Sequence, residues 1–218
     1  MSGDRAPAAP IFDAVFQRNF EELLHWRRDV RRFRTIPLEP ELVNQLLALA
    51  DCSPSVGNSQ PWRFVLVENE SIREKIRQEF RRANAEALSR YQGAKAALYA
   101  RLKLSGLNEA PVHIAVFADL AAGQGHGLGC NTMPEMLSYS AVTAVHTLWL
   151  AARSRKLGLG WVSILDPEAV TRIIGVEQDW RLVAYLCLGY PDEEHLDPEL
   201  ERHNWQARTS VQARISVK

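Results

Sequence analysis

The stretch SPSVGNSQPWRF, from Ser53 to Phe64, contains the most informative local pattern in this sequence. Serine, glycine, asparagine and proline cluster at its start, which predicts a loop, and the strand WRFVLVE (62–68) follows directly. Within the loop, Ser55, Asn58 and Gln60 place three hydrogen-bonding side chains within six residues. Amide side chains carry donors and acceptors together, so the loop suits the edge of a heteroaromatic ring better than a phosphate.

A second stretch, WRRDVRRFR (26–34), places five arginines around one aspartate, Asp29. It lies where the helical pattern FDAVFQRNFEELLHWRRD ends. One interpretation is a solvated basic helix end, which the helix dipole favours. The other is a phosphate site, because guanidinium groups bind phosphate oxygens through paired hydrogen bonds and Arg27, Arg28 and Arg31 can diverge there.

The composition is that of one globular domain. The chain has 218 residues and a formal net charge of zero, from 26 basic and 26 acidic residues. This balance argues against a general nucleic-acid binder but leaves room for a local anion site. The longest uncharged run, 136–152, is shorter than a bilayer span, so no membrane association is expected.

Cysteine usage and the first residues favour a reducing, cytoplasmic location. The three cysteines are far apart, with no CxxC pair, and the start MSGDRAPAAPIFD has no apolar signal region. The loop sequence GQGHGLGCN offers His126 and Cys130 without a third ligand nearby, so no metal site is expected. The same loop fails the G-x-G-x-x-G dinucleotide pattern, because Cys130 stands where the third glycine belongs.

The order of elements predicts an α+β fold with few strands and several long helices. Residues 1–10 are expected to be a disordered lead, followed by a single domain (11–210) and an extended tail (192–218). The predicted strands are 62–68, 110–119, 157–165 and 180–191. The predicted helices are 12–29, 39–54, a charged region 71–104, 133–156 and 166–175.

Two of these helices have specific features at their starts. Asp166 and Pro167 are placed as N-cap and first residue of the short helix. Thr132 and Glu135 form a predicted capping box for helix 133–156. That helix is apolar all round, which predicts burial in a core or a subunit interface and makes His146 a hydrogen-bonded buried residue.

Taken together, RRDVRRF (27–33) and SPSVGNSQPWRF resemble the nitroreductase flavoprotein superfamily. There the two stretches read R-x-S-x-R/K-x-F/Y and S-x-x-N-x-Q-P-W. Their order, the gap between them and the later GLGWVSI (158–164) agree, so the resemblance spans roughly residues 18–210. It implies a mainly antiparallel central sheet flanked by helices, in a domain-swapped homodimer with FMN at the interface.

The resemblance also implies roles for individual residues. Arg27 and Arg28 would hold the FMN phosphate and ribityl chain with Arg208 from the tail, and Arg31 would lie at the N1/O2 edge of the ring. The partner subunit would contribute Ser55, Asn58 and Gln60. The remaining expected FMN contacts are Asp29, Val30, Val162 and Ser163, the last two by N5 and C4a.

Two departures from the usual pattern narrow the expected reaction. Asp29 replaces the usual serine, and Val162-Ser163 replaces a pair such as glutamate-glycine. Both are similar to the flavin-destructase branch, which converts reduced FMN and O2 to 5,6-dimethylbenzimidazole for the cobalamin lower ligand and releases erythrose 4-phosphate. A carboxylate repels phosphate, so Asp29 is expected to address the sugar as base or proton relay, with Ser163 as the second catalytic residue.

Other functions remain open from the residues alone. A conventional FMN-dependent nitroreductase or NAD(P)H:flavin oxidoreductase would share every FMN contact, and a flavin-binding protein without chemistry is a further alternative. Residues 71–108 are either a lid over the flavin, with Tyr91 and Tyr99 as contacts, or a solvated helix pair. In the destructase interpretation, a separate flavin reductase using NAD(P)H supplies the reduced FMN.

Overall fold

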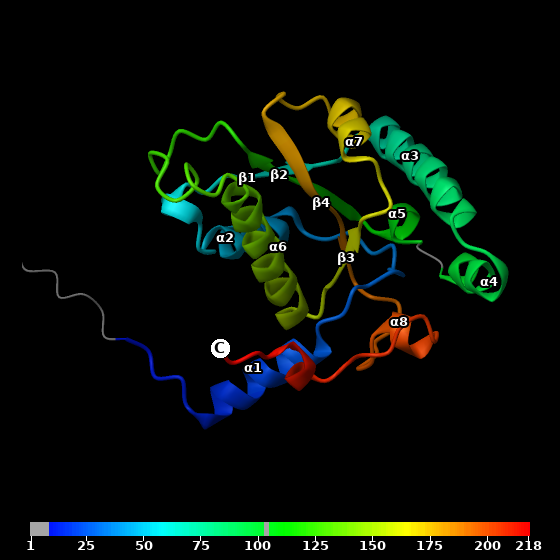
Figure 1. Ribbon diagram of the computed structural model, residues 1–218, viewed down its shortest axis with the longest axis horizontal. Coiled ribbons are helices and arrows are strands. Elements are labelled where there is room, and N and C mark those ends of the chain that lie inside the picture. The colour runs from blue at the N-terminus through cyan, green and yellow to red at the C-terminus, as the bar shows by residue number, and fades with distance from the viewer. Residues whose placement is uncertain (1–8, 103–104) are drawn as a thin grey trace, which may run out of the picture.

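An antiparallel sheet forms the centre of the molecule (Figure 1). The computed structural model describes residues 9–102 and 105–218, so most of the expected disordered lead lies outside the described residues. The four strands are ordered β1-β2-β4-β3 and every neighbouring pair is antiparallel. Their bounds are β1 (Trp62–Leu66), β2 (Val112–Asp119), β3 (Gly158–Val162) and β4 (Trp180–Gly189). The predicted α+β fold with a mainly antiparallel sheet is confirmed.

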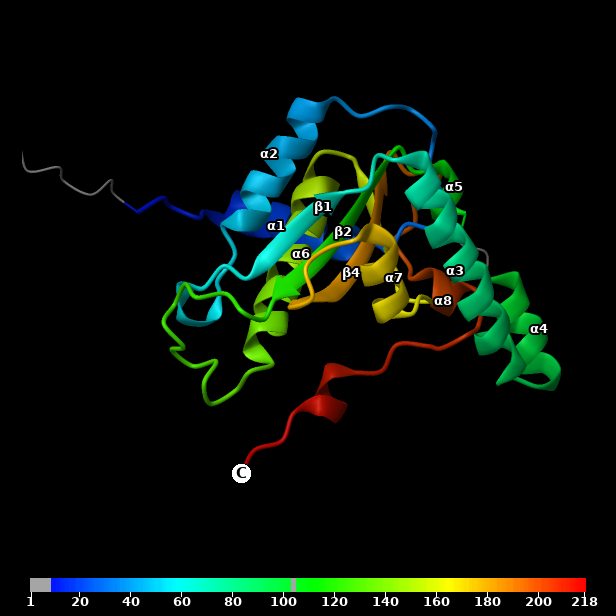
Figure 2. The same ribbon diagram turned by 90° about the horizontal axis from the view of Figure 1, so that it is seen from above.

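Helices cover both faces of this sheet (Figure 2). Side chains alternate along β2, so Ile114 and Val116 pack with helices α2 and α6, whereas Ala115 and Phe117 pack with α3 and α7. The helix bounds are α1 (Ala14–Trp26), α2 (Pro40–Asp51), α3 (Glu70–Ser89), α4 (Gly93–Arg101), α5 (Gly106–Glu109), α6 (Met136–Ser154), α7 (Pro167–Ile174) and α8 (Glu199–Arg202). Two short 3-10 turns are η1 (Val56–Asn58) and η2 (Val211–Arg214).

Helix α7 begins as predicted, whereas helix α6 does not. The Asp166 side chain accepts hydrogen bonds from two backbone N–H groups of the first turn, and Pro167 is the first helical residue. The predicted capping box before α6 is wrong, because the Thr132 N–H donates to Gly129 O in a turn. Helix α6 starts at Met136, and its N-cap, Glu135, makes no side-chain cap hydrogen bond.

Within the described chain, α6 is buried on one side only. One face packs on the sheet through Ala144, Val145 and Leu148, which are fully buried. Tyr139 on the other side is 53% exposed and His146 is also exposed, so burial of this side in a subunit interface stays a prediction. Apolar composition around a helix cannot show which side the rest of the chain covers.

The charged region forms two helices with a break after Ser89, and residues 103–104 lie outside the described residues. Tyr91 and Tyr99 stack on each other with ring centroids 5.0 Å apart, and Tyr91 meets the edge of Trp205 at 5.5 Å. The Lys95 ammonium lies 4.1 Å from the centre of the Trp205 ring. Trp205 belongs to the tail, so residues 193–205 fold back on their own chain and the predicted fully extended tail is wrong there.

Glycines in β3 let a neighbouring segment approach very closely. A Cβ atom on Gly160 would lie 2.2 Å from the Val30 carbonyl oxygen, and one on Gly158 would meet the Val30 side chain at 2.7 Å. Both distances are below any real Cβ contact, so these glycines permit the pairing of β3 with the arginine-rich segment. The glycine-rich entry to this strand therefore has a steric function.

We expect Gly160→Ala to lower the free energy of unfolding by roughly 1–3 kcal/mol, because the added methyl group forces segment 27–34 away from β3. Chemical denaturation measures the change. Gly123→Ala is the matched control, since a Cβ there meets nothing within 4 Å. Equal stability of the two variants would contradict the close approach.

Candidate functional site

The arginine-rich segment 27–34 is extended and runs beside β3. Helix α1 ends at Trp26, and Arg27 already has extended backbone angles. The Val30 N–H donates to Leu159 O at 3.1 Å, and Asp29 forms a parallel bridge with Leu159. Further along, Phe33 bridges Pro191 after β4. These contacts place the segment along the sheet edge at β3.

Asp29 is attached to β3 through its side chain as well. Its Oδ1 accepts the Trp161 N–H at 2.9 Å, and its Oδ2 lies 3.6 Å from Arg31 Nε. Desolvation raises the pKa of Asp29, while the Trp161 hydrogen bond and the Arg31 charge act in the opposite direction. The side chain is 38% exposed, so water moderates these effects. Asp29 is thus a fixed but accessible carboxyl group.

Within this segment, Arg28 and Arg32 make the shortest side-chain contacts with the tail. Arg28 donates through Nε to Leu196 O at 2.8 Å, and Arg32 forms ion pairs with Glu193 and Glu199. The tail therefore crosses the arginine segment and uses these two guanidinium groups. Arg28, predicted as an FMN ligand, has a protein partner in this arrangement.

Positive charge nevertheless accumulates beside Asp29. Desolvation lowers the pKa of Arg27, the charge of Asp29 opposes this, and Arg208 lowers it further. Desolvation also lowers the pKa of Arg28, as do Arg27 and Arg208, against the charge of Asp197. Arg27 also lies over the Trp149 ring, 4.8 Å from its centre. The structure thus brings Arg208, predicted from the tail, near the segment. Mutual repulsion among three guanidiniums makes this a site that an anion stabilises.

Val30 and Val162 differ in exposure. Val30 packs against the β3 glycines but is only half-buried and lines a pocket with Asp29 and Arg31, whereas Val162 is buried in the core at 3% exposure. Any contact of Val162 with a ligand is through its backbone. Ser163 is exposed, one residue beyond β3 and two beyond the Trp161 amide that Asp29 holds. The strand thereby places Ser163 on the same edge as Asp29.

The other predicted residues, Ser55, Asn58 and Gln60, lie at a different end of α6. Their loop docks on the first half of this helix, where Val56 N–H donates to Ser140 Oγ, whereas Arg28 O accepts from Trp149 Nε1 in the second half. Nine helical residues at 1.5 Å each separate these anchors by roughly 14 Å. The described chain therefore keeps these residues and segment 27–34 apart, and the two groups are called half-sites below.

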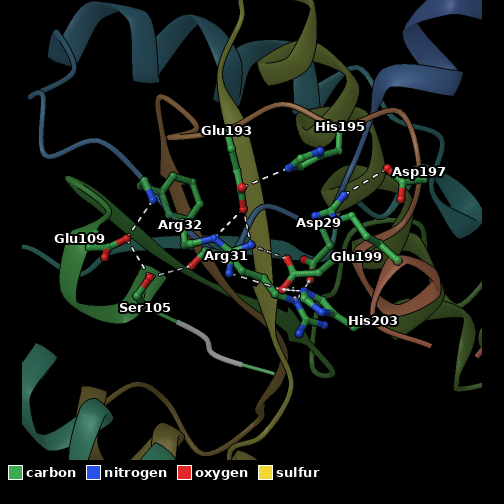
Figure 3. Close-up of polar contacts among 12 residues, drawn as sticks. Asp29, Arg31, Arg32, Ser105, Glu109, Glu193, His195, Asp197, Glu199 and His203 are labelled. Carbon is green, nitrogen blue, oxygen red and sulfur yellow. Dashed lines mark hydrogen bonds and ion pairs between the residues drawn. The ribbon is translucent and has the colours of Figure 1, made fainter. Parts of the chain in front are cut away.

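Sequence reasoning missed Glu199, which lies among the arginines (Figure 3). Its side chain is 11% exposed, and Oε2 lies 3.2 Å from Arg32 Nη2 and 4.0 Å from Arg31 Nε. These groups line a small pocket of about 40 Å³ with Asp29 and Glu193. Charge balance could have predicted this acidic partner, because a neutral chain with an arginine cluster has acidic residues elsewhere. The tail is acidic from Asp192 to Glu201.

Sequence reasoning also missed the support of Arg31 from α5. Ser105 N–H donates to Arg31 O at 3.2 Å, and its hydroxyl donates to Glu109 Oε2 at 2.8 Å (Figure 3). The same Glu109 oxygen accepts the Phe33 N–H at 3.0 Å. The end of the charged helical region thus anchors the backbone of the arginine segment. No group of three or more His, Cys, Asp or Glu in the described part of the chain could hold a metal ion.

A profile of the Nitroreductase family matches residues 24–190, which includes segment 27–34, the loop with Ser55, Asn58 and Gln60, and the whole sheet. The chain belongs to the nitroreductase family. Its relatives include a protein of Rhodospirillum rubrum named 5,6-dimethylbenzimidazole synthase, 56% identical over 91% of this chain and 94% of that protein. A protein of the same name from Rhodobacter capsulatus is 45% identical over 89% of this chain and 94% of its own length.

Solved structures agree with this family. A crystal structure of oxidized iodotyrosine deiodinase bound to FMN and 3-iodo-L-tyrosine superposes with a TM-score of 0.71. It shares 25% identity, covering 91% of this chain and 97% of that one. A nitroreductase-like protein from Streptococcus mutans, 18% identical, shares the fold with a TM-score of 0.70 over 93% of this chain and 98% of that chain. No helix in the described residues has the length and apolarity of a membrane span.

We expect Asp29→Ala to lower the free energy of unfolding by roughly 1 kcal/mol by leaving the Trp161 N–H unpaired, whereas Asp29→Asn keeps an acceptor there.

The raised pKa of Asp29 also predicts that stability depends on pH. Its charged form opposes folding above the ordinary aspartate pKa, so Asp29→Asn should gain stability relative to wild type as pH rises from about 4 toward 7. Thermal unfolding of wild type and both variants across this pH range measures the two effects. A stability difference between Asp29→Asn and wild type that stays constant with pH would contradict the raised pKa of Asp29.

Proposed function

We propose that this chain converts reduced FMN and O2 to 5,6-dimethylbenzimidazole, with release of erythrose 4-phosphate, for the lower ligand of cobalamin. The observation that carries the proposal is the position of Asp29, which β3 holds in place beside Arg31 within a cluster of guanidiniums. Because a carboxylate at this position would repel a phosphate, it is expected to contact the neutral sugar of the ligand. The names of the two bacterial relatives support the same reaction.

The residues present fit FMN. Arg27 and Arg28 are neighbours and the charge of Arg208 acts on both, so these three guanidiniums could together bind the phosphate. Arg31 supplies a cation for the N1/O2 edge, where reduced flavin carries negative charge. Bound reduced FMN supplies both the electrons for O2 and the carbon skeleton of the product. The FMN-bound deiodinase structure of the same fold supports this fit.

Asp29 can hold and move a proton with one oxygen while the other stays fixed. Oδ1 accepts the Trp161 amide, so Oδ2 is the atom available to exchange a proton with the ribityl carbon C1′. A raised pKa brings the carboxyl group closer to the pH at which it can both accept and donate protons. Arg31, 3.6 Å from Oδ2, orients this oxygen.

Ser163 provides a small polar group at the flavin ring. It lies just beyond β3, is exposed and carries a hydroxyl group that can donate or accept. In the proposal this hydroxyl lies by N5 and C4a, where O2 reacts. Its small size leaves room for O2, and the buried Val162 side chain does not intrude.

The proposed active form is a homodimer with domain-swapped elements. The two half-sites of one subunit lie apart along α6, so a complete FMN site needs Ser55, Asn58 and Gln60 from a second copy. Helix α1 has no buried residue, and Phe16 on it is 46% exposed, so an apolar face is available to a partner. The end of the tail, residues 206–218, is exposed and is proposed to reach that partner.

We propose that α3 and α4 act as a lid. Ser105, at the end of this region, holds the Arg31 backbone, and the Tyr91–Tyr99–Trp205 cluster joins α4 to the tail. Tyr91 and Tyr99 therefore act through the tail instead of contacting flavin directly. In the cell, a cytoplasmic flavin reductase using NAD(P)H would supply the reduced FMN.

We expect purified protein, mixed with chemically reduced FMN in air, to form 5,6-dimethylbenzimidazole detectable by mass spectrometry. Asp29→Asn should still bind FMN, because its Oδ1 keeps the Trp161 hydrogen bond, but should form no product. Normal product formation by that variant would remove Asp29 from the mechanism. Steady turnover of NADH with nitroaromatics, and no product from reduced FMN, would favour a conventional nitroreductase.

We expect Ser163→Gly to slow product formation from reduced FMN roughly tenfold to a hundredfold through loss of its hydroxyl group. The folded structure should be unaffected, since the Ser163 side chain is exposed and lies outside β3. Single-turnover product formation is the measurement, with FMN affinity as the control. An unchanged rate would show that the hydroxyl group takes no part.

A further inference from the structure

The glycine-rich loop, residues 120–133, has no role in the function described so far. In both views it lies beside the loop that carries Ser55, Asn58 and Gln60 (Figures 1 and 2). A Cβ atom on Gly125 would lie 2.7 Å from Gly57 O, and one on Gly57 would lie 2.9 Å from Leu128 O. The two loops thus meet backbone to backbone, which explains the glycines at the contact.

One side chain, Gln124, bridges the two predicted FMN ligands of this half-site. Its Nε2 donates to Asn58 O and to Gln60 Oε1, each at 2.8 Å. A backbone carbonyl can only accept, so the atom of Gln124 that faces Asn58 O must be the amide nitrogen. The second hydrogen of that nitrogen then requires an oxygen on Gln60.

This geometry settles the orientation of the Gln60 amide. Its Oε1 is occupied by Gln124, and within the described residues Gln60 Nε2 has no hydrogen-bond partner. Asn58 and Gln60 both have positive φ, 55° and 44°, a conformation that costs energy in non-glycine residues. The Gln60 N–H also donates to Ser55 Oγ at 3.0 Å. The loop is therefore held with one amide N–H group free to donate.

We propose that Gln124 is a positioning residue, which fixes Gln60 so that its Nε2 donates a hydrogen bond to an oxygen or nitrogen acceptor of FMN. This inference rests on the proposed function, in which Gln60 of one subunit meets the FMN of the other. Gln124 itself does not touch FMN.

Titration of the apo chain with FMN, followed by flavin fluorescence, tests the proposal. Gln124→Glu replaces the donor by acceptors, so the Gln60 amide turns its Nε2 toward residue 124 and away from FMN. The FMN dissociation constant should therefore rise roughly threefold to tenfold. Gln124→Met only releases the amide and should have the smaller effect. Gln178→Glu, the same change at an exposed residue, is the charge control and should match wild type.

A double-mutant cycle separates positioning from a structural role. In a Gln60→Ala background, Gln124→Glu should cause no further loss of FMN affinity, because the group it orients is gone. Equal affinity of wild type and both Gln124 variants, or a full further loss in the Gln60→Ala background, would overturn the inference and leave the proposed function intact. A wild-type chain that binds no FMN would overturn both.

Discussion

The site depends on the attachment of the arginine segment to β3. The Trp161 amide holds the Asp29 side chain, Leu159 O holds the Val30 amide, and both bonds require the backbones to approach more closely than a side chain at Gly160 would allow. Without this pairing, residues 27–34 would be a solvated loop after α1. With it, a carboxyl group and a guanidinium lie at a defined edge of the sheet. Only Val162 separates Ser163 from Trp161, whose amide holds Asp29.

Charge balance within the chain follows from the same arrangement. The acidic tail crosses the segment, so Glu193 and Glu199 pair with Arg32, and Leu196 O accepts from Arg28. Desolvation lowers the pKa values of Arg27 and Arg28, and the charge of Arg208 lowers both further, while Asp29 opposes the shift at Arg27. A protein of zero net charge can thus contain a local anion site, because its compensating acids bind only part of the cluster.

Helix α6 separates the two half-sites that the proposed reaction combines. The loop with Gln60 docks near Ser140, and the arginine segment docks near Trp149. Neither half offers both a phosphate site and the amide donors for a flavin ring. The apolar face of α1 and the exposed residues of α6 provide surface through which a second copy could unite them. The proposed lid, through Ser105, and the tail, through Glu199, both reach the arginine segment.

The sequence by itself determined the family, the strands and the start of α7, because these depend on local patterns such as RRDVRRF, the spacing of Ser55, Asn58 and Gln60, and the Asp166-Pro167 pair. Only the tertiary structure decided which arginines bind the tail, which face of α6 is covered, and how Glu199, Ser105 and Gln124 support the predicted residues. Those contacts join positions about 60 to 170 residues apart. Long-range pairing depends on how the sheet and helices pack together, and no local periodicity or propensity records it.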